Sequence, residues 1–218
     1  MEIALQLTTA PKAKPDPNQL GFGRFFTDHM FVMDYNPDQG WHDPRIVPYG
    51  PIELEPSTVT FHYAQAVFEG MKAYRTEDGR ALLFRPRLNI ERLNHSNDRL
   101  CIPAVDEEFV LKALKRLLSI ERDWIPTAPG TSLYIRPFIF ATDHILGVHP
   151  SKTYKLMIIL SPVASYYPQG INPVSIYVEP EYVRAVRGGT GQAKASGNYA
   201  SGLKAQRIAN AAGHAQVL

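Results

Sequence analysis

The 218-residue sequence predicts an α+β fold, in which an N-terminal antiparallel sheet with packed helices is followed by the start of a second, truncated domain. Stretches rich in β-branched and aromatic residues recur along the chain, separated by loops that contain glycine and proline. Two consecutive helical patterns lie between these stretches. After a further proline- and glycine-containing segment, the sequence changes to a glycine-rich region around Lys194, which marks the second domain.

Composition limits the kinds of partner. The chain is 44% hydrophobic and carries a formal net charge of +2 without a long run of either sign, which indicates no nucleic-acid or acidic-membrane surface. Cys101 is the single cysteine, so neither an internal disulfide nor a cysteine-built metal site is expected, and the seven histidines lack paired metal-ligand spacing. No apolar run resembles a signal peptide or a membrane span. We expect a cytoplasmic protein that binds small molecules or another subunit.

The first third of the chain is predicted to be mostly extended. An N-terminal arm reaches about Asn18, and the segment 40–51, with its glycines and prolines, is predicted to be a loop. A Glu77-Asp-Gly-Arg80 turn indicates a β-hairpin. Strands are expected where β-branched and aromatic residues cluster, at 25–35, 59–64, 72–75 and 81–85.

Two helices are predicted next. The first begins at Pro86, since proline is tolerated in a first turn, and ends near Leu100 before Pro103. Asp106 can cap the second. Its buried stripe would consist of Val110, Leu114 and Leu117. Both helices are expected to pack on one face of the sheet.

The remaining elements define the domain boundary. Strands are predicted at 131–141, 154–163 and 174–179. We assign residues 1–166 to the first domain, 167–173 to an interdomain linker and 174–218 to the beginning of an incomplete second domain. An alanine-rich helical pattern covers 198–212, Gly213 is a plausible stop, and a strand is expected to begin at 215.

The glycine-rich region presents a single amine. Gly188, Gly189 and Gly191 precede Lys194 and Gly197 follows it, so the backbone can take positive φ angles and approach a ligand closely. The spacing excludes a phosphate-binding P-loop and a dinucleotide fingerprint, because required glycine and hydroxyl positions are occupied by other residues. A reactive lysine must be neutral part of the time, which a partly desolvated site favours. A solvated lysine in a surface loop is the alternative.

The string from Gly188 to Gln206, Gly-Gly-Thr-Gly-x-x-Lys-x-x-Gly-Asn-Tyr-Ala-x-x-Leu-x-Ala-Gln, resembles the internal-lysine segment of branched-chain amino acid aminotransferases. These are fold-type IV pyridoxal 5'-phosphate enzymes, and the resemblance extends through most of the upstream chain. It implies reversible transfer of the amino group of leucine, isoleucine or valine to 2-oxoglutarate. D-amino acid aminotransferases and aminodeoxychorismate lyases share the fold. The strings Phe68-Glu-Gly-Met-Lys72 and Leu133-Tyr-Ile-Arg-Pro137 favour the branched-chain group.

The resemblance assigns the cofactor contacts. It implies that Lys194 is the catalytic residue and binds the cofactor, that Arg92 binds its phosphate, and that Tyr199 bonds its ring oxygen. A solvated arginine and a buried core tyrosine are the competing interpretations of Arg92 and Tyr199. No Asp or Glu occurs between Ala195 and Leu218, so the acid that would face the pyridine nitrogen is missing from this stretch.

A truncated, non-catalytic relative is therefore a second hypothesis. In the resembling enzymes the acid lies beyond the position that corresponds to Leu218. If the chain were complete at 218 residues, we would expect weak cofactor retention and little turnover.

The resemblance also implies a substrate pocket. An aromatic box would bury a branched side chain, and an arginine with a tyrosine could hold the distal carboxylate of glutamate. The residues implied around the side chain are Phe22, Tyr63, Phe68, Tyr134 and Arg136. Leu146, Val148 and Tyr166 resemble loop positions that close the pocket, the first two from a partner subunit, which implies a homodimer. Aromatic residues on strands are equally often part of a core.

Overall fold

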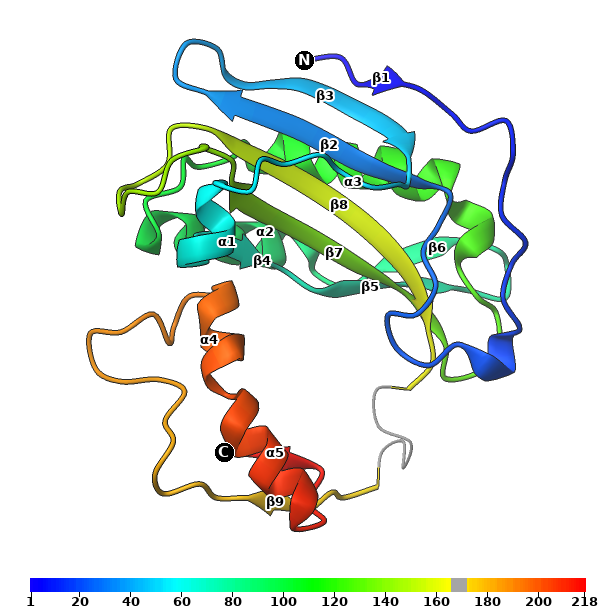
Figure 1. The fold of residues 1–218 in the computed structure, drawn as a ribbon. Helices are drawn as coiled ribbons and strands as arrows, with labels where there is room; N and C mark the ends of the chain where they lie inside the picture. The colour runs from blue at the N-terminus through cyan, green and yellow to red at the C-terminus, as the bar shows by residue number, and fades with distance from the viewer. Residues whose placement is uncertain (166–171) are drawn as a thin grey trace.

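The computed structural model describes residues 1–165 and 172–218. A single large sheet dominates the fold, with two long helices behind it (Figure 1). The second part of the described chain approaches the sheet at the end of one short strand, β4. The expected α+β class is confirmed.

Eight strands within the described residues form the large sheet, in the order β1-β3-β2-β8-β7-β5-β6, with β4 also pairing with β7. All pairs are antiparallel except β1 with β3. Their bounds are β1 Ala4–Leu5, β2 His29–Asn36, β3 Gly40–Pro48, β4 Ala66–Phe68, β5 Met71–Arg75, β6 Ala81–Leu83, β7 Ser132–Ala141 and β8 Tyr154–Val163. The predicted hairpin between β5 and β6 is confirmed.

Helices α2 (Pro86–Arg99) and α3 (Glu107–Ile120) lie where they were predicted. The Asp106 side chain accepts a hydrogen bond from Phe109 N, as an N-cap should. Short 3₁₀ helices occur at Pro17–Gln19 and Arg122–Trp124.

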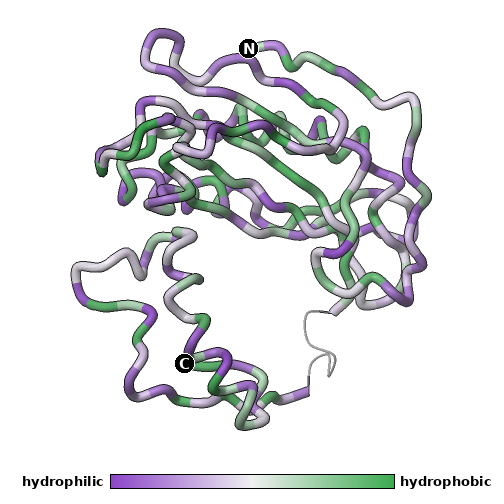
Figure 2. Tube along the Cα trace, in the orientation of Figure 1, coloured by the Kyte–Doolittle hydropathy of each residue, from purple (hydrophilic) through white to green (hydrophobic). Residues whose placement is uncertain are grey.

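Successive side chains of the central strands point to opposite faces of the sheet, one covered by helices and one facing the candidate site. On β7 and β8 the aliphatic residues that join the main core with α2 and α3 are Leu133, Ile135, Ile139, Leu156, Ile158 and Leu160. The intervening residues of β7, including Tyr134 and Arg136, point to the other face, because successive strand side chains alternate. Figure 2 shows hydrophobic stretches concentrated in the central strands. The helix-covered core thus leaves the opposite face available for a site.

Two predictions for the first third were wrong. Gly40–Pro48 is strand β3 rather than a loop, because its turn-forming residues sit at a bulge: Val32 pairs with Arg45 and Asp34 with His42, so two residues oppose Met33. Asp43, at this bulge, has a φ of 50°.

The second wrong prediction is the strand at 59–64, which is helix α1 (Val59–Tyr63). The helix ends at Ala64, which adopts a left-handed conformation with φ 52°. Its β-branched and aromatic composition favoured a strand, but tertiary context overrides so weak a preference. The three-residue strand β4 directly after it was missed.

The second part of the described chain is small. It contains β9 (Ile176–Tyr177), α4 (Ser196–Ser201), α5 (Leu203–Ala211) and β10 (Gln216–Val217). The predicted helix over 198–212 is two helices, which meet at Gly202. The strand expected at 215 is β10, and it has a parallel partner in β9. Gly213 follows α5 with φ 82°.

Most of the predicted linker, 167–173, lies outside the described residues, as does Tyr166. The proposed domain boundary stays a prediction. No helix in the part of the chain that the structure describes is both long and apolar enough to cross a membrane.

Candidate active site

The backbone of Lys194 is hydrogen-bonded to the first part of the chain through both its N–H and its carbonyl. Lys194 N donates to Ser96 Oγ on α2 at 2.9 Å, and its carbonyl accepts from Phe68 N at the end of β4 at 3.1 Å. A single β-bridge joins Val67 to Ala195. Ser96 is buried, and no sequence pattern indicated its role. The amine is therefore positioned by elements distant in the sequence.

The side chain of Lys194 ends in an aromatic environment. Its Nζ donates to Tyr199 Oη at 2.7 Å and lies 4.6 Å from the centre of the Phe68 ring. The Phe68 and Tyr199 rings have centroids 4.8 Å apart. The structure thus brings together three residues that the resemblance had assigned to one site.

Asn198 holds the glycine-rich bend in shape. This buried amide donates to the carbonyls of Thr190 at 2.7 Å and Ala193 at 2.8 Å, and accepts from the Thr190 hydroxyl at 2.7 Å. Of the four glycines around Lys194, only Gly188 has a positive φ, 77°. Gly191 is required for packing, since a Cβ there would lie 2.5 Å from Ala185 Cβ. The expectation of several positive φ angles was therefore only partly correct.

Arg92 forms a two-pronged ion pair that the sequence did not indicate. Its Nε and one terminal nitrogen donate to the two carboxylate oxygens of Glu69 at 2.6 and 2.8 Å. The Glu69 side chain is 1% exposed and that of Arg92 is 54% exposed. The Glu69 carboxylate raises the pKa of Arg92, and the nearby Tyr199 contributes in the same direction. Arg92 is thus a cation whose position is fixed by Glu69, and it is near enough to Tyr199 for that residue to affect its pKa.

An open cavity of about 660 Å³ lies beside Lys194. Its lining combines aromatic side chains with two cations and consists of Phe22, Phe68, Tyr134, Arg136, Phe138, Ile159, Lys194, Ser196 and Tyr199. Four of the five residues expected around a substrate side chain are among them.

Arg136 is the cation on the sheet side of this cavity. It donates to Tyr134 Oη at 2.9 Å, and its guanidinium carbon lies 4.5 Å from the Phe68 ring centre. Within residues 1–165 and 172–218 no carboxylate lies within ion-pair distance of it. A half-buried cation without an acidic partner suits an anionic ligand.

A smaller adjoining cavity of about 340 Å³ shares Phe22, Tyr134, Arg136 and Ile159 with the first. Ser161 lines it, directly opposite Tyr134 in the pairing of β7 with β8. The Ser161 hydroxyl is buried and has no hydrogen-bond partner among the described residues. The region around Arg136 therefore contains a hydroxyl to which no described residue hydrogen-bonds.

Gly70 sets the position of the Tyr134 hydroxyl. A Cβ at this position would lie 2.3 Å from Tyr134 Oη, so the replacement Gly70→Ala must displace the ring. Because Arg136 donates to the same oxygen, we expect the Tyr134–Arg136 pair to separate, with a loss of roughly 1–3 kcal/mol in the free energy of unfolding. Denaturant unfolding measures the loss. Gly50→Ala, where a Cβ would meet open space, is the control and should leave stability unchanged.

Three other predicted pocket residues lie away from this cavity. Tyr63 Oη donates to the Leu146 carbonyl at 3.0 Å, and the side chains of Leu146 and Val148 are 66% and 83% exposed. Neither cavity is lined by them. The assignment of Tyr63 to the substrate pocket, and of Leu146 and Val148 to a loop that closes the pocket of a partner subunit, stays a prediction.

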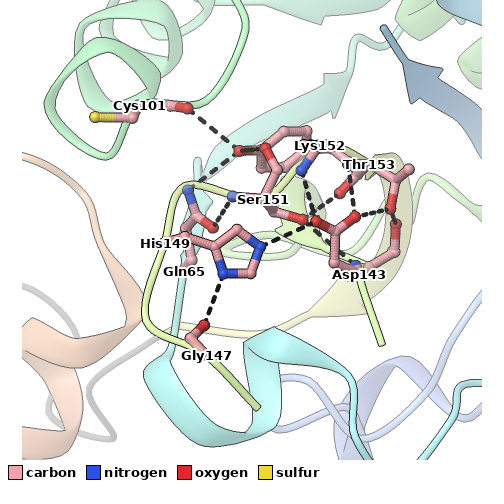
Figure 3. Close-up of polar contacts among 10 residues, drawn as sticks. Gln65, Cys101, Asp143, Gly147, His149, Ser151, Lys152 and Thr153 are labelled. Carbon is pink, nitrogen blue, oxygen red and sulfur yellow. Dashed lines mark hydrogen bonds and ion pairs between the residues drawn. The ribbon is translucent and has the colours of Figure 1, made fainter. Parts of the chain in front are cut away.

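The loop that carries Leu146 and Val148 is anchored by the Asp143 carboxylate (Figure 3). This group accepts hydrogen bonds from Lys152 N at 2.8 Å, Thr153 N at 3.0 Å and Thr153 Oγ1 at 2.7 Å. Burial alone would raise the pKa of Asp143, but these bonds hold it below its usual 3.8. The ends of the loop are thus joined through one ionised side chain.

This anchor predicts an acid-sensitive contribution to stability. Because the folded-state pKa is lowered, the contribution is present above about pH 4 and is lost as the pH falls through the folded-state value. We expect Asp143→Asn to lower the free energy of unfolding by about 1–3 kcal/mol at neutral pH, and this difference to shrink below about pH 4. Thermal melts across this pH range measure it. Asp38→Asn, at an exposed position in a turn, is the control; an equal effect there would contradict the prediction.

The site residues meet most of the requirements of pyridoxal phosphate. Lys194 provides an amine, Tyr199 a hydroxyl and Arg92 a cation; Lys194 and Tyr199 line the cavity, and Arg92 is paired with Glu69, the residue after Phe68 of its lining. The fourth requirement is an acid against the pyridine nitrogen. Among the described residues, Glu69 is the carboxylate that hydrogen-bonds to one of these three residues, and both of its oxygens already accept from Arg92. The residues present fit the cofactor, with the acid unassigned.

Comparison with solved structures defines the class of fold. A branched-chain aminotransferase from Thermoproteus uzoniensis, solved with norvaline, superposes with a TM-score of 0.70 at 21% identity, covering 87% of this chain and 59% of that one. The branched-chain amino acid aminotransferase from Thermobaculum terrenum, solved in its PLP form, gives a TM-score of 0.68 at 19% identity, covering 88% and 58%. The fold is that of the fold-type IV aminotransferases.

Sequence comparison finds close relatives within this class. The chain is 65% identical over 216 residues to branched-chain-amino-acid aminotransferase 2 of Bacillus subtilis, which covers 99% of this chain and 60% of the relative. Branched-chain-amino-acid transaminase 1 of the same organism is 60% identical over 217 residues, 99% of this chain and 61% of the relative. No protein-family model matches the chain. The resemblance to branched-chain amino acid aminotransferases is confirmed, and the chain spans about three fifths of these relatives' length.

Proposed function

We propose that this chain forms part of a pyridoxal phosphate-dependent enzyme that reversibly transfers the amino group of leucine, isoleucine or valine to 2-oxoglutarate. The observation that carries the proposal is the position of Lys194 Nζ, which is bonded to Tyr199 Oη and borders a cavity shared with Arg136. The identity with curated branched-chain aminotransferases supports it.

Three residues of the chain would hold the cofactor. Lys194 would bind it through its amine, Tyr199 would donate to its ring oxygen, and Arg92 would pair with its phosphate. Bound pyridoxal phosphate supplies an aldehyde for the substrate amine and a ring that accepts electrons. Lys194 Nζ, when neutral, would move a proton between the substrate α-carbon and the cofactor. The hydrogen bond that this nitrogen donates to Tyr199 Oη orients it.

The cavity is suited to two unlike substrates. Phe22 and Phe68 offer apolar surface to a branched side chain, while Arg136 and Tyr134 offer donors to the distal carboxylate of glutamate. The Phe22 and Tyr134 rings pack in a tilted arrangement with centroids 4.9 Å apart, which gives this wall a defined shape. We propose that the loop with Leu146 and Val148 closes the pocket of the second subunit in a homodimer. A cytoplasmic location is proposed with it, given that Cys101 is free.

Chemical trapping tests the proposal. After incubation of the native full-length polypeptide with pyridoxal phosphate, borohydride reduction and peptide mapping should place a phosphopyridoxyl group on Lys194. Transamination of leucine should then exceed that of D-alanine. Colourless protein with unmodified Lys194 would support a non-catalytic relative, and activity on D-alanine alone would support a D-amino acid aminotransferase.

A further inference from the structure

We propose that Glu69 is a positioning residue for the cofactor's phosphate: it fixes the guanidinium of Arg92 in the orientation that receives the anion. This inference rests on the proposed function, because it assumes that Arg92 meets the phosphate. It gives a role to a buried acid that no part of the proposed mechanism requires.

Glu69 is itself rigidly held. It lies directly after β4, is fully buried, and accepts from Asn89 Nδ2 on α2 at 2.9 Å and from Gly70 N at 3.1 Å, in addition to Arg92. Two parallel N–H···O bonds to a carboxylate fix the plane of a guanidinium as well as its distance. The orientation of Arg92 is therefore set by a group that cannot move with solvent.

The pair leaves Arg92 able to bind a second anion. A guanidinium has five N–H donors, and the two bonds to Glu69 use one at Nε and one at a terminal nitrogen. The other three face away from Glu69. The Arg92 side chain is 54% exposed, which leaves it open to a second anion, and Tyr199 of the proposed cofactor site is near enough to raise the pKa of Arg92.

A purely structural ion pair is the competing explanation. Burying a carboxylate costs free energy that its partner rarely repays, so a stability role alone gives a weak reason to place Glu69 in the core. The two explanations predict different measurements. A structural pair affects unfolding without changing cofactor affinity, whereas a positioning pair changes affinity through Arg92.

The experiment compares Glu69→Gln, Arg92→Gln and the double variant in the native full-length polypeptide. Glutamine keeps the volume of Glu69, but its NH₂ group faces the guanidinium donors, so only one of the two bonds can form. We expect the dissociation constant for pyridoxal phosphate, measured by absorbance titration, to rise roughly 10- to 100-fold in Glu69→Gln. Saturating cofactor should restore kcat to within about twofold of the unsubstituted protein, since the substrate groups are untouched.

The double variant tests the route of the effect. If Glu69 acts through Arg92, adding Glu69→Gln to Arg92→Gln should cause no further loss of affinity. Additive losses would overturn the proposal, as would an unchanged dissociation constant in Glu69→Gln combined with a lowered melting temperature. Glu108→Gln is the matched control, because it removes the exposed acidic partner of Arg87, an arginine that lies on α2 with Arg92.

Failure of this inference is distinguishable from failure of the proposed function. If the unsubstituted protein does not bind pyridoxal phosphate, the function is wrong. If it binds and Arg92→Gln weakens binding while Glu69→Gln does not, only the role of Glu69 is wrong.

Discussion

Replacing Lys194 with alanine is expected to reduce transamination roughly 10⁴-fold or more, because this residue would both bind the cofactor and transfer the proton. Among the described residues, Tyr199 Oη is the group bonded to Lys194 Nζ, and a tyrosine hydroxyl cannot form the same covalent bond to an aldehyde. Single-turnover kinetics with leucine and the borohydride label together measure the loss.

A neighbouring lysine provides the control for this variant. Lys204 lies on α5, where its Nζ is 6.0 Å from the Tyr182 ring centre, and it does not line the cavity. Lys204→Ala should retain the activity and leave the label on Lys194. If Lys194→Ala remained active, or if the label moved to another peptide without loss of turnover, Lys194 could not be the catalytic amine.

The parts of the site that could be predicted are those encoded within short strings. Lys194 and Tyr199 are five residues apart, and one turn around the buried Asn198 brings them together. The contacts made by Ser96 and Glu69 could not be predicted in this way. Each depends on the approach of α2 to β4 or to the lysine bend, and no local spacing records that approach.

The fold also divides into elements with a strong local pattern and elements that depend on distant pairing partners. Long strands such as β7 and β8, and helices with a clear cap such as α3, were predicted because each has a strong local pattern. Strand β3 was missed because a bulge accommodates Asp43 and Pro44, residues that otherwise indicate a turn. Its pairing with β2 compensates for a poor local preference, and pairing partners are not visible in the sequence of one strand.

Replacing Arg136 with methionine is expected to separate the two substrate classes. Methionine keeps much of the length and apolar contact with Phe68 but removes the donors that would face the distal carboxylate of glutamate. A hydrogen-bonded charge of this kind contributes about 1.5–3 kcal/mol, so kcat/KM for glutamate should fall roughly 10- to 100-fold. For leucine, whose side chain needs no donor, the loss should stay below about fivefold.

The comparison of substrates, rather than the size of either loss, decides the role of Arg136. Its bond to Tyr134 Oη also shapes the cavity wall, so a general disturbance would lower kcat/KM for both substrates together. Tyr134→Phe removes that bond and leaves the charge, and it should reduce activity on glutamate less than Arg136→Met does. Equal losses for leucine and glutamate in Arg136→Met would mean that the arginine supports the wall instead of binding a carboxylate. A selective loss would assign Arg136, which no carboxylate among the described residues pairs with, to the acidic substrate.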